Sequence, residues 1–258
     1  MEIIGFGMSQ IATFLLVLAR VGGIFTTAPV MSNVHVSPTV RVAIALALTF
    51  VFVPMVHYDA ADFDMLRYLV VLVKEIVIGL AMGFLVSLMF AAIQMAGAYV
   101  DLQVGFGFAQ VIDPMSSEHN AVIGQFQNLV ATLLFLVVNG HHLMIMGLAD
   151  SFAVVPIGKA AFNPAAAGGM MQVFAIIFIA ALKIGAPVVG AIFLTDVALG
   201  ILARTVPQLN VFILGFPAKI IVGLAVVFAV LPIAFVVMGG LFSGLHRDLL
   251  AMLRLLRA

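Results

Sequence analysis

Eight charged side chains lie within, or at the ends of, the long apolar runs of this 258-residue sequence. A charge at the centre of a bilayer costs about 2.5–3.5 kcal/mol, so each should face protein or water and have a partner. These groups could relay ions or protons; alternatively, they form salt bridges between subunits or reach the membrane surface from helix ends. Because they are scattered and form no stripe, salt bridges or snorkelling are favoured. The eight residues are Arg20, Lys74, Glu75, Asp101, Lys183, Asp196, Arg204 and Lys219.

Lys74 and Glu75 are neighbours in the sequence. Successive residues of a helix point about 100° apart, so these two side chains do not face one another. We therefore expect each of them to have a different partner elsewhere in the fold.

The sequence lacks the residues that several other kinds of chemistry require. The absence of cysteine excludes disulfides, thiol nucleophiles and thiolate metal sites. Gln110 replaces the third glycine of a dinucleotide-binding motif, and no strand is expected before it. His141 and His142 diverge on a helix, and Asp101 has no second intramembrane aspartate in a matching context. The sequence also contains no P-loop, zinc-protease or nucleophile-elbow motif. We therefore predict a protein that is not an enzyme and that uses no cofactor, catalytic residue or metal.

A glycine- and phenylalanine-rich segment lies between two long apolar runs near the middle of the chain. Two glycines this close cost a helix about 1 kcal/mol each, and the Asp-Pro pair then favours a turn, so a pliable loop is expected. Loops are usually polar, whereas this one is apolar. It could be a movable plug that closes a passage by excluding water, or a re-entrant turn packed against neighbouring helices, which the residues alone favour. The segment contains Gly105, Phe106, Gly107, Phe108, Ala109, Val111, Ile112, Asp113 and Pro114.

The composition requires an apolar environment for most of the chain. Hydrophobic residues make up 65% of the sequence and charged residues only 9%, whereas soluble domains carry about 25% charged residues. We therefore predict an integral membrane protein. A net charge of +0 gives no overall attraction to nucleic acid. The N-terminus has no basic region, which indicates an uncleaved first helix.

About six long, kinked apolar helices should position these residues. Arg20 is expected to interrupt the first apolar run and Pro187 to break a later one, while Pro217 and Pro232 kink the last. The third run is about 50 Å long as a helix, well beyond a bilayer core, and its Gly79-xxx-Gly83 spacing allows close packing on another helix. A polar connector is expected over 150–169. The apolar runs cover 3–19, 21–31, 42–57, 68–100, 121–148, 170–203 and 211–240.

Several unrelated blocks of sequence, in their order along nearly the whole chain, resemble the flagellar branch of the FliR/SctT family of type III secretion export-gate proteins. The segment 198–217 carries the resemblance most strongly. The blocks are Ala28–Val30, Gly97–Pro114, Asn139–His141, Pro156–Gly158, Leu199–Arg204, Pro207–Phe212 and Gly215–Pro217.

The resemblance implies an all-α subunit, present once in a hetero-oligomeric core of bent helical hairpins. Its partners would be FliP and FliQ in that core, FlhB and FlhA beside it, and unfolded flagellar export substrates. It would lie in the bacterial inner membrane, at the flagellar basal body. The single export-gate domain, 1–258, would comprise N-terminal helices 1–100, a central plug loop 101–120, helical hairpins 121–240 and a basic cytoplasmic tail 241–258.

The resemblance also favours a gate over a packing turn for the central loop. In that family the matching loop projects into the channel and helps to close it, and Phe106 and Phe108 fit the apolar part of such a plug. Two alternatives remain open. Buried charges could serve a secondary transporter or ion channel, or the chain could be a structural scaffold without a gating role.

Overall fold

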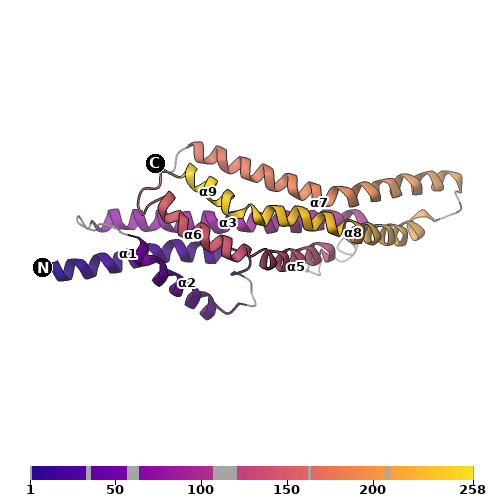
Figure 1. The fold of residues 1–258 in the computed structure, drawn as a ribbon. Helices are drawn as coiled ribbons and strands as arrows, with labels where there is room; N and C mark the ends of the chain where they lie inside the picture. The colour runs from indigo at the N-terminus through magenta and orange to yellow at the C-terminus, as the bar shows by residue number, and fades with distance from the viewer. Residues whose placement is uncertain are drawn as a thin grey trace. The chain divides into compact units, whose positions relative to one another are not determined.

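The computed structural model describes residues 2–32, 36–56, 64–106, 121–161, 164–206, 208 and 210–257, and over these ranges the chain is helical apart from turns and one isolated β-bridge. Figure 1 follows the helices in chain order. They are α1 (Glu2–Thr27), α2 (Pro38–Phe52), the 3-10 turn η1 (Val53–Met55), α3 (Met65–Val104), α5 (Val122–Val137), α6 (Gly140–Val154), α7 (Pro164–Thr205), α8 (Val211–Ser243) and α9 (Leu245–Leu255).

Most of these helices are suited to a membrane. Within the described residues, five are long and apolar enough to cross a bilayer, and the bent pair α5 and α6 could form a sixth span. The prediction of an all-α integral membrane protein with about six apolar helices is confirmed. The longest helices, α3 and α7, have 40 and 42 residues. At 1.5 Å per residue each is about 60 Å long, roughly twice the thickness of a hydrocarbon core.

Two details of the predicted helices were wrong. Helix α7 continues through Pro187, where a break was expected, whereas Arg20 interrupts only the apolar sequence and α1 continues through it. A proline in a helix removes one N–H donor, but membrane helices tolerate it where local adjustments satisfy the freed carbonyl. The connector expected over 150–169 is shorter, because α6 extends to Val154 and α7 begins at Pro164.

The apolar run 121–148 is divided into two helices at Asn139. This residue has a φ of 56° and a ψ of 33°, which is the left-handed conformation. Asparagine tolerates this conformation better than most residues and commonly ends helices in this way. The two helices bend by 64° at this point.

The chain divides into two compact units. Unit 1 contains residues 1–88, 139–174 and 243–258, and unit 2 contains residues 89–138 and 175–242. Several helices contribute to both units because α3, α7 and α8 each continue from one into the other.

In unit 1, α1 and α3 approach each other closely through glycines. A Cβ atom added to Gly79 would overlap the carbonyl oxygen of Arg20, and one added to Gly83 would overlap the Thr27 hydroxyl. A Cβ on Gly23 of α1 would lie 2.8 Å from the backbone nitrogen of Leu80. The Gly79-xxx-Gly83 spacing therefore does allow the close helix packing that was predicted from it.

The C-terminal helix α9 folds back onto α6 within unit 1. Its Leu249 side chain lies where Gly147 has no Cβ atom, and Leu245, Leu249 and Leu253 are fully buried. His246 Nε2 of α9 lies 2.8 Å from an Asp150 carboxylate oxygen of α6. The basic C-terminal stretch thus presents an apolar face to its own chain.

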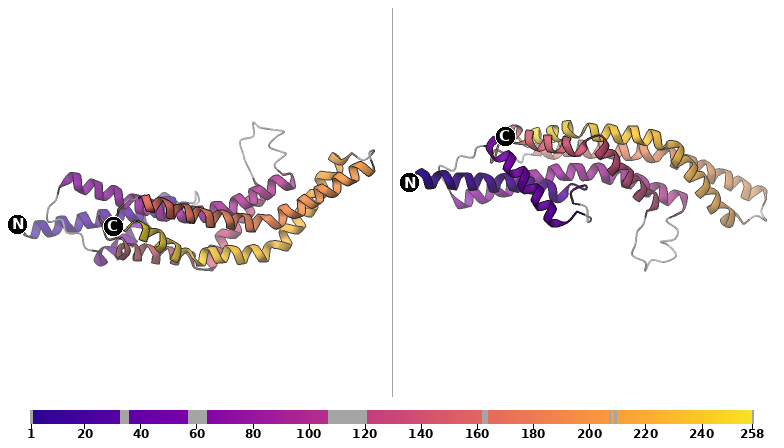
Figure 2. Two further views of the ribbon diagram at one scale, coloured as in Figure 1. Left: turned by 90° about the horizontal axis from the view of Figure 1, so that it is seen from above. Right: turned by 60° about the horizontal axis from the view of Figure 1, so that its bottom comes forward.

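Unit 2 is built around an antiparallel pair formed by the second part of α7, which ends at Thr205, and by α8, which begins at Val211. The two helices lie side by side (Figure 2). The last part of α3 packs between them, since Val104 Cγ2 lies 2.5 Å from the place of a Cβ on Gly223 and Ile192 lies beside it. Phe90, Phe135 and Phe242 form an aromatic cluster, with ring centroids 5.2–5.5 Å apart. Helix α5 completes this unit.

Candidate functional site

The backbone leaves helix α3 at the first glycine of the predicted loop. Helix α3 ends at Val104, and the N–H of Gly105 donates the last bond of this turn, 3.1 Å to the Asp101 carbonyl. Gly105 has a φ of 107°, and a Cβ on it would meet the Phe216 ring at 3.0 Å. Both the backbone angle and the close aromatic ring require glycine here. The predicted departure from helical backbone is confirmed at this residue.

The side chain of Asp101 connects the two ends of the central segment. Its two carboxylate oxygens accept hydrogen bonds of 3.0 Å each from the N–H groups of Ile123 and Gly124. These donors belong to the first turn of α5, where N–H groups have no partner within the helix. A carboxylate at a helix N-terminus is favourable because of these free donors and the helix dipole. Asp101, itself 4% exposed, therefore holds the start of α5 against the end of α3.

An apolar cluster from four helices lies beneath this point. Val104 at the end of α3 packs with buried side chains of α5, α7 and α8, and the half-buried Phe106 ring packs against the same cluster. Phe106 is therefore seated on the body of unit 2. The buried members are Val100, Val104, Ile123, Val188, Ile192 and Val227.

Most of the predicted gate lies outside the described residues. These residues are Gly107, Phe108, Ala109, Val111, Ile112, Asp113 and Pro114. Of the predicted gate, the structure describes Gly105 and Phe106, so the gating role of the segment stays a prediction.

A buried ion pair between Arg20 of α1 and Glu75 of α3 forms the polar centre of unit 1. Arg20 Nη2 and Nε lie 2.5 and 2.6 Å from Glu75 Oε2, and both side chains are 0% exposed. Arg20 also donates to Ser151 Oγ at 3.1 Å and to the Val155 carbonyl at 3.0 Å. Its guanidinium carbon lies 4.5 Å from the centre of the Phe152 ring. One arginine thereby joins α1, α3 and the end of α6.

The chain after α6 is held by the two adjacent charges of α3. Glu75 Oε1 accepts from the N–H of Gly158 at 3.1 Å, and Gly158 has a φ of 78°. Lys74 Nζ donates to the Ala160 carbonyl at 3.1 Å. The prediction of separate partners for Lys74 and Glu75 is confirmed.

The remaining predicted charges belong to unit 2 and differ in their surroundings. Lys219 of α8 forms a 2.8 Å ion pair with Asp196 of α7, in which the two side chains are 20% and 44% exposed. Lys183 and Arg204 of α7 are exposed, and neither has an acidic partner among the described residues. Whether any of the eight charges contacts another subunit stays a prediction.

The bonds of Arg20, Lys74, Glu75 and Asp101 connect helices and turns within the described part of the chain. No three His, Asp or Glu side chains in it lie close enough to hold a metal ion. Sequence reasoning missed Ser151, Phe152 and Phe216 as partners of the charged centre and of Gly105. The sequence does not indicate the Ser151 and Phe152 contacts, because they depend on which helices pack together. Phe216, by contrast, lies in one of the blocks that carried the family resemblance.

Comparison with known proteins gives consistent matches along the chain. A family model described as "Bacterial export proteins, family 1" matches residues 11–245. The flagellar biosynthetic protein FliR of Bacillus subtilis (strain 168) is 38% identical over 234 residues, which cover 89% of this chain and 90% of that protein. The FliR protein of Escherichia coli (strain K12) is 33% identical over 216 residues, covering 84% of this chain and 83% of that protein. That of Pectobacterium carotovorum subsp. carotovorum is 32% identical over 244 residues, covering 95% and 93%.

Proposed function

The chain belongs to family 1 of the bacterial export proteins and is a membrane component of the flagellar export apparatus, and we propose that it helps to form and to seal the channel for unfolded export substrates. The seal is assigned to the apolar segment that begins at Gly105 and continues to Pro114. This role follows from the family resemblance and from the physical character of the segment.

The observation that carries the proposal is the way in which the segment is anchored. Asp101 bonds to Ile123 and Gly124 across the whole intervening stretch of chain, so the two ends of that stretch lie beside each other. Gly105 turns the backbone out of α3, and Phe106 packs on the apolar cluster below it. The two ends of the proposed seal are therefore held together by the helices that flank it.

Apolar side chains suit a seal that must exclude ions but yield to a polypeptide. A narrow passage lined by such side chains loses its water, and ions cannot cross a dry constriction. No particular ion pair or hydrogen bond must break when a substrate arrives, since packing alone closes the passage. Phe108, Val111 and Ile112 would supply such side chains in this segment.

The proposal includes the partners that the family resemblance implies. The chain would assemble with FliP and FliQ in the export-gate core and contact FlhB and FlhA. It would do so in the bacterial inner membrane at the flagellar basal body, where unfolded flagellar proteins pass through the core. Several apolar helices with exposed surfaces support such an assembly.

A deletion tests the seal directly. We expect the complex that contains a chain without residues 105–110 to assemble normally but to conduct ions when reconstituted in a planar bilayer. A length-matched variant, in which the same six residues are replaced by glycine and serine, should also conduct, because it keeps the loop length and loses both phenylalanine side chains. If intact complexes of both variants conduct no ions across the bilayer, the result would support a structural scaffold without a gate.

A further inference from the structure

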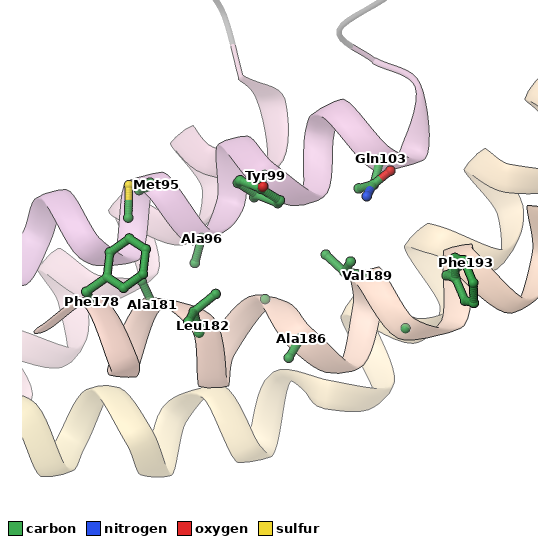
Figure 3. A pocket seen from close by; sticks show the side chains of 12 residues that line it. Met95, Ala96, Tyr99, Gln103, Phe178, Ala181, Leu182, Ala186, Val189 and Phe193 are labelled. Carbon is green, nitrogen blue, oxygen red and sulfur yellow. The ribbon is translucent and has the colours of Figure 1, made fainter. Parts of the chain in front are cut away.

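A groove about 490 Å³ in volume runs along one side of unit 2, between α3 and α7. Figure 3 shows Met95, Ala96, Tyr99 and Gln103 of α3 facing Leu182 and Val189 of α7 across it. Its lining is almost entirely apolar. In water such a groove would be an unfavourable surface, so it must be covered by lipid or by another apolar chain.

Lys183 is the charged residue nearest to this groove along the sequence of α7. It directly follows Leu182, a lining residue that is 55% exposed, and it precedes Ala186 and Gly190, which also line the groove, by three and seven residues. Residues with these spacings share one side of a helix. Lys183 is exposed, and the described residues give it no acidic partner. An ammonium group is therefore placed on an apolar surface where it remains uncompensated by its own chain.

Pro187 removes one backbone N–H donor at the same level of α7. Proline has no N–H, so the carbonyl of Lys183, four residues earlier, loses the donor that a regular helix would supply. In a membrane every polar group without a partner is costly. The α7 surface thus carries a cation beside an apolar groove.

The acidic groups of unit 2 that the structure describes are already engaged within the chain. Asp196 pairs with Lys219, and Asp101 caps α5. Neither acid pairs with Lys183. A negative charge that compensates Lys183 must therefore come from outside the described residues.

Small residues along the groove leave room for the backbone of another helix. Ala96, Ala181, Gly185 and Gly190 lie along it. A Cβ atom on Gly190 would meet nothing within 4 Å, so packing within this chain does not require glycine there. Small residues at such positions let a second helix approach closely in a membrane.

We propose that this groove seats a membrane-embedded helix of another export-apparatus subunit, and that a carboxylate on that helix pairs with Lys183. The inference rests on the proposed assembly with other subunits and does not depend on the gate. Charge complementarity selects the occupant, because an acidic helix would compensate Lys183 while its apolar face fills the groove. A lipid phosphate reached by a snorkelling Lys183 is the competing outcome.

Charge variants test the pairing in complexes purified from native membranes. We expect Lys183→Glu to reduce the yield of assembled complex about tenfold or more, since each 1.4 kcal/mol lost is a factor of ten. Lys183→Arg should keep the yield. A photo-crosslinking amino acid at Leu182, compared with one at the 69% exposed Leu194, should identify the neighbouring peptide. Reversing a carboxylate in that peptide to lysine should restore assembly of the Lys183→Glu chain.

A steric pair of variants tests the groove independently of charge. Gly190→Leu should block the incoming helix and lower the yield of complex at least several-fold, while the chain itself still inserts. Gly200→Leu is the matched control, because Gly200 lies on the same helix, lines no part of the groove and also has open space at its Cβ position. The control should assemble normally.

Three results would overturn the inference. They are normal assembly of both Lys183→Glu and Gly190→Leu chains, crosslinks from Leu182 to lipid alone, or a crosslinked helix without any acidic residue. Failure here is separable from failure of the seal, because the seal is measured as ion conductance of complexes that have assembled.

Discussion

The ion pair of unit 1 and the Lys183 surface of unit 2 treat their charges in opposite ways. In unit 1, Arg20 and Glu75 are completely buried and bonded to each other and to groups of the same chain. In unit 2, Lys183 is exposed and has no acidic partner among the described residues. Half of the residues in the apolar window of α1, which carries Arg20, are buried, compared with 39% of those in the window of α7, which carries Lys183. The ion pair is therefore completed by contacts of its own chain, whereas the apolar surface around Lys183 is left for other molecules to cover.

This contrast separates charges that hold helices of the chain together from a charge that its own chain leaves without an acidic partner. Around Arg20, the buried ion pair and the close glycine contacts between α1 and α3 favour one arrangement of the helices. Around Lys183, the apolar groove and the exposed helix faces of unit 2 can accept contacts from another molecule. Substitutions in unit 1 should therefore lower the stability of the chain itself, and those in unit 2 should change assembly and sealing.

The largest effect should come from breaking the ion pair of unit 1. Arg20→Met leaves the buried Glu75 carboxylate unpaired, and removing one partner of such a pair costs about 3–5 kcal/mol. We expect the variant to show a much lower unfolding temperature in detergent. The double variant Arg20→Met/Glu75→Leu should recover most of the loss, because a pair of apolar side chains leaves no buried charge. A single variant as stable as the parent would remove the distinction between the units.

A slightly smaller effect should follow from filling the space between α1 and α3. Gly79→Val places side-chain atoms onto the Arg20 carbonyl, and because backbone must move the loss should be about 3 kcal/mol, the upper part of the usual range for overpacking. Gly22→Val is the control on α1, since a Cβ there meets nothing within 4 Å. Thermal unfolding of the two variants should differ clearly. Equal unfolding temperatures would show that the helices do not depend on this close approach.

These two sites also show what the sequence can and cannot reveal. The spacing of Gly79 and Gly83 predicted close packing because it depends only on local helix geometry. Likewise, adjacent helix residues diverge, so separate partners could be predicted for Lys74 and Glu75. The identity of those partners could not, because Arg20 and Ala160 are far away in the chain and meet Glu75 and Lys74 only after the helices have packed.

The same limit explains the errors in helix boundaries. Whether Pro187 ends a helix depends on the groups that surround its missing donor, and those come from tertiary structure. Asn139 could adopt a left-handed conformation, but nothing local required it within an apolar run. At Gly105, in contrast, two nearby glycines sufficed to predict that the helix ends.

An effect of intermediate size is expected from substituting Asp101 in unit 2. Asp101→Asn replaces one accepting oxygen by an NH₂ group, which opposes an N–H of α5. The loss of one charged acceptor and of a helix cap should cost about 1.5–3 kcal/mol locally. We expect complexes with this variant to assemble but to show raised ion conductance, as the ends of the central segment separate. Asp101→Glu, which keeps the charge, should leak less. Unchanged conductance with Asp101→Asn would show that the hydrogen bonds from α5 to Asp101 do not contribute to the seal.

The smallest effect is expected at the partly exposed ion pair of α7 and α8. Lys219 and Asp196 are 20% and 44% exposed, and pairs of this kind contribute about 0–1 kcal/mol. Lys219→Met should therefore change the unfolding temperature of the isolated chain only slightly. A loss as large as that of Arg20→Met would show that unit 2 also depends on a charge pair within the chain, which would weaken the contrast.

The central claim, that an anchored apolar segment closes the export passage, is tested most directly by a density map of the closed, assembled complex. We predict that residues 105–110 lie at the narrowest part of the central passage, with the Phe108 side chain facing the passage and Phe106 seated at its wall. Residues 105–110 facing lipid or bulk water, away from the passage, would contradict the proposed seal.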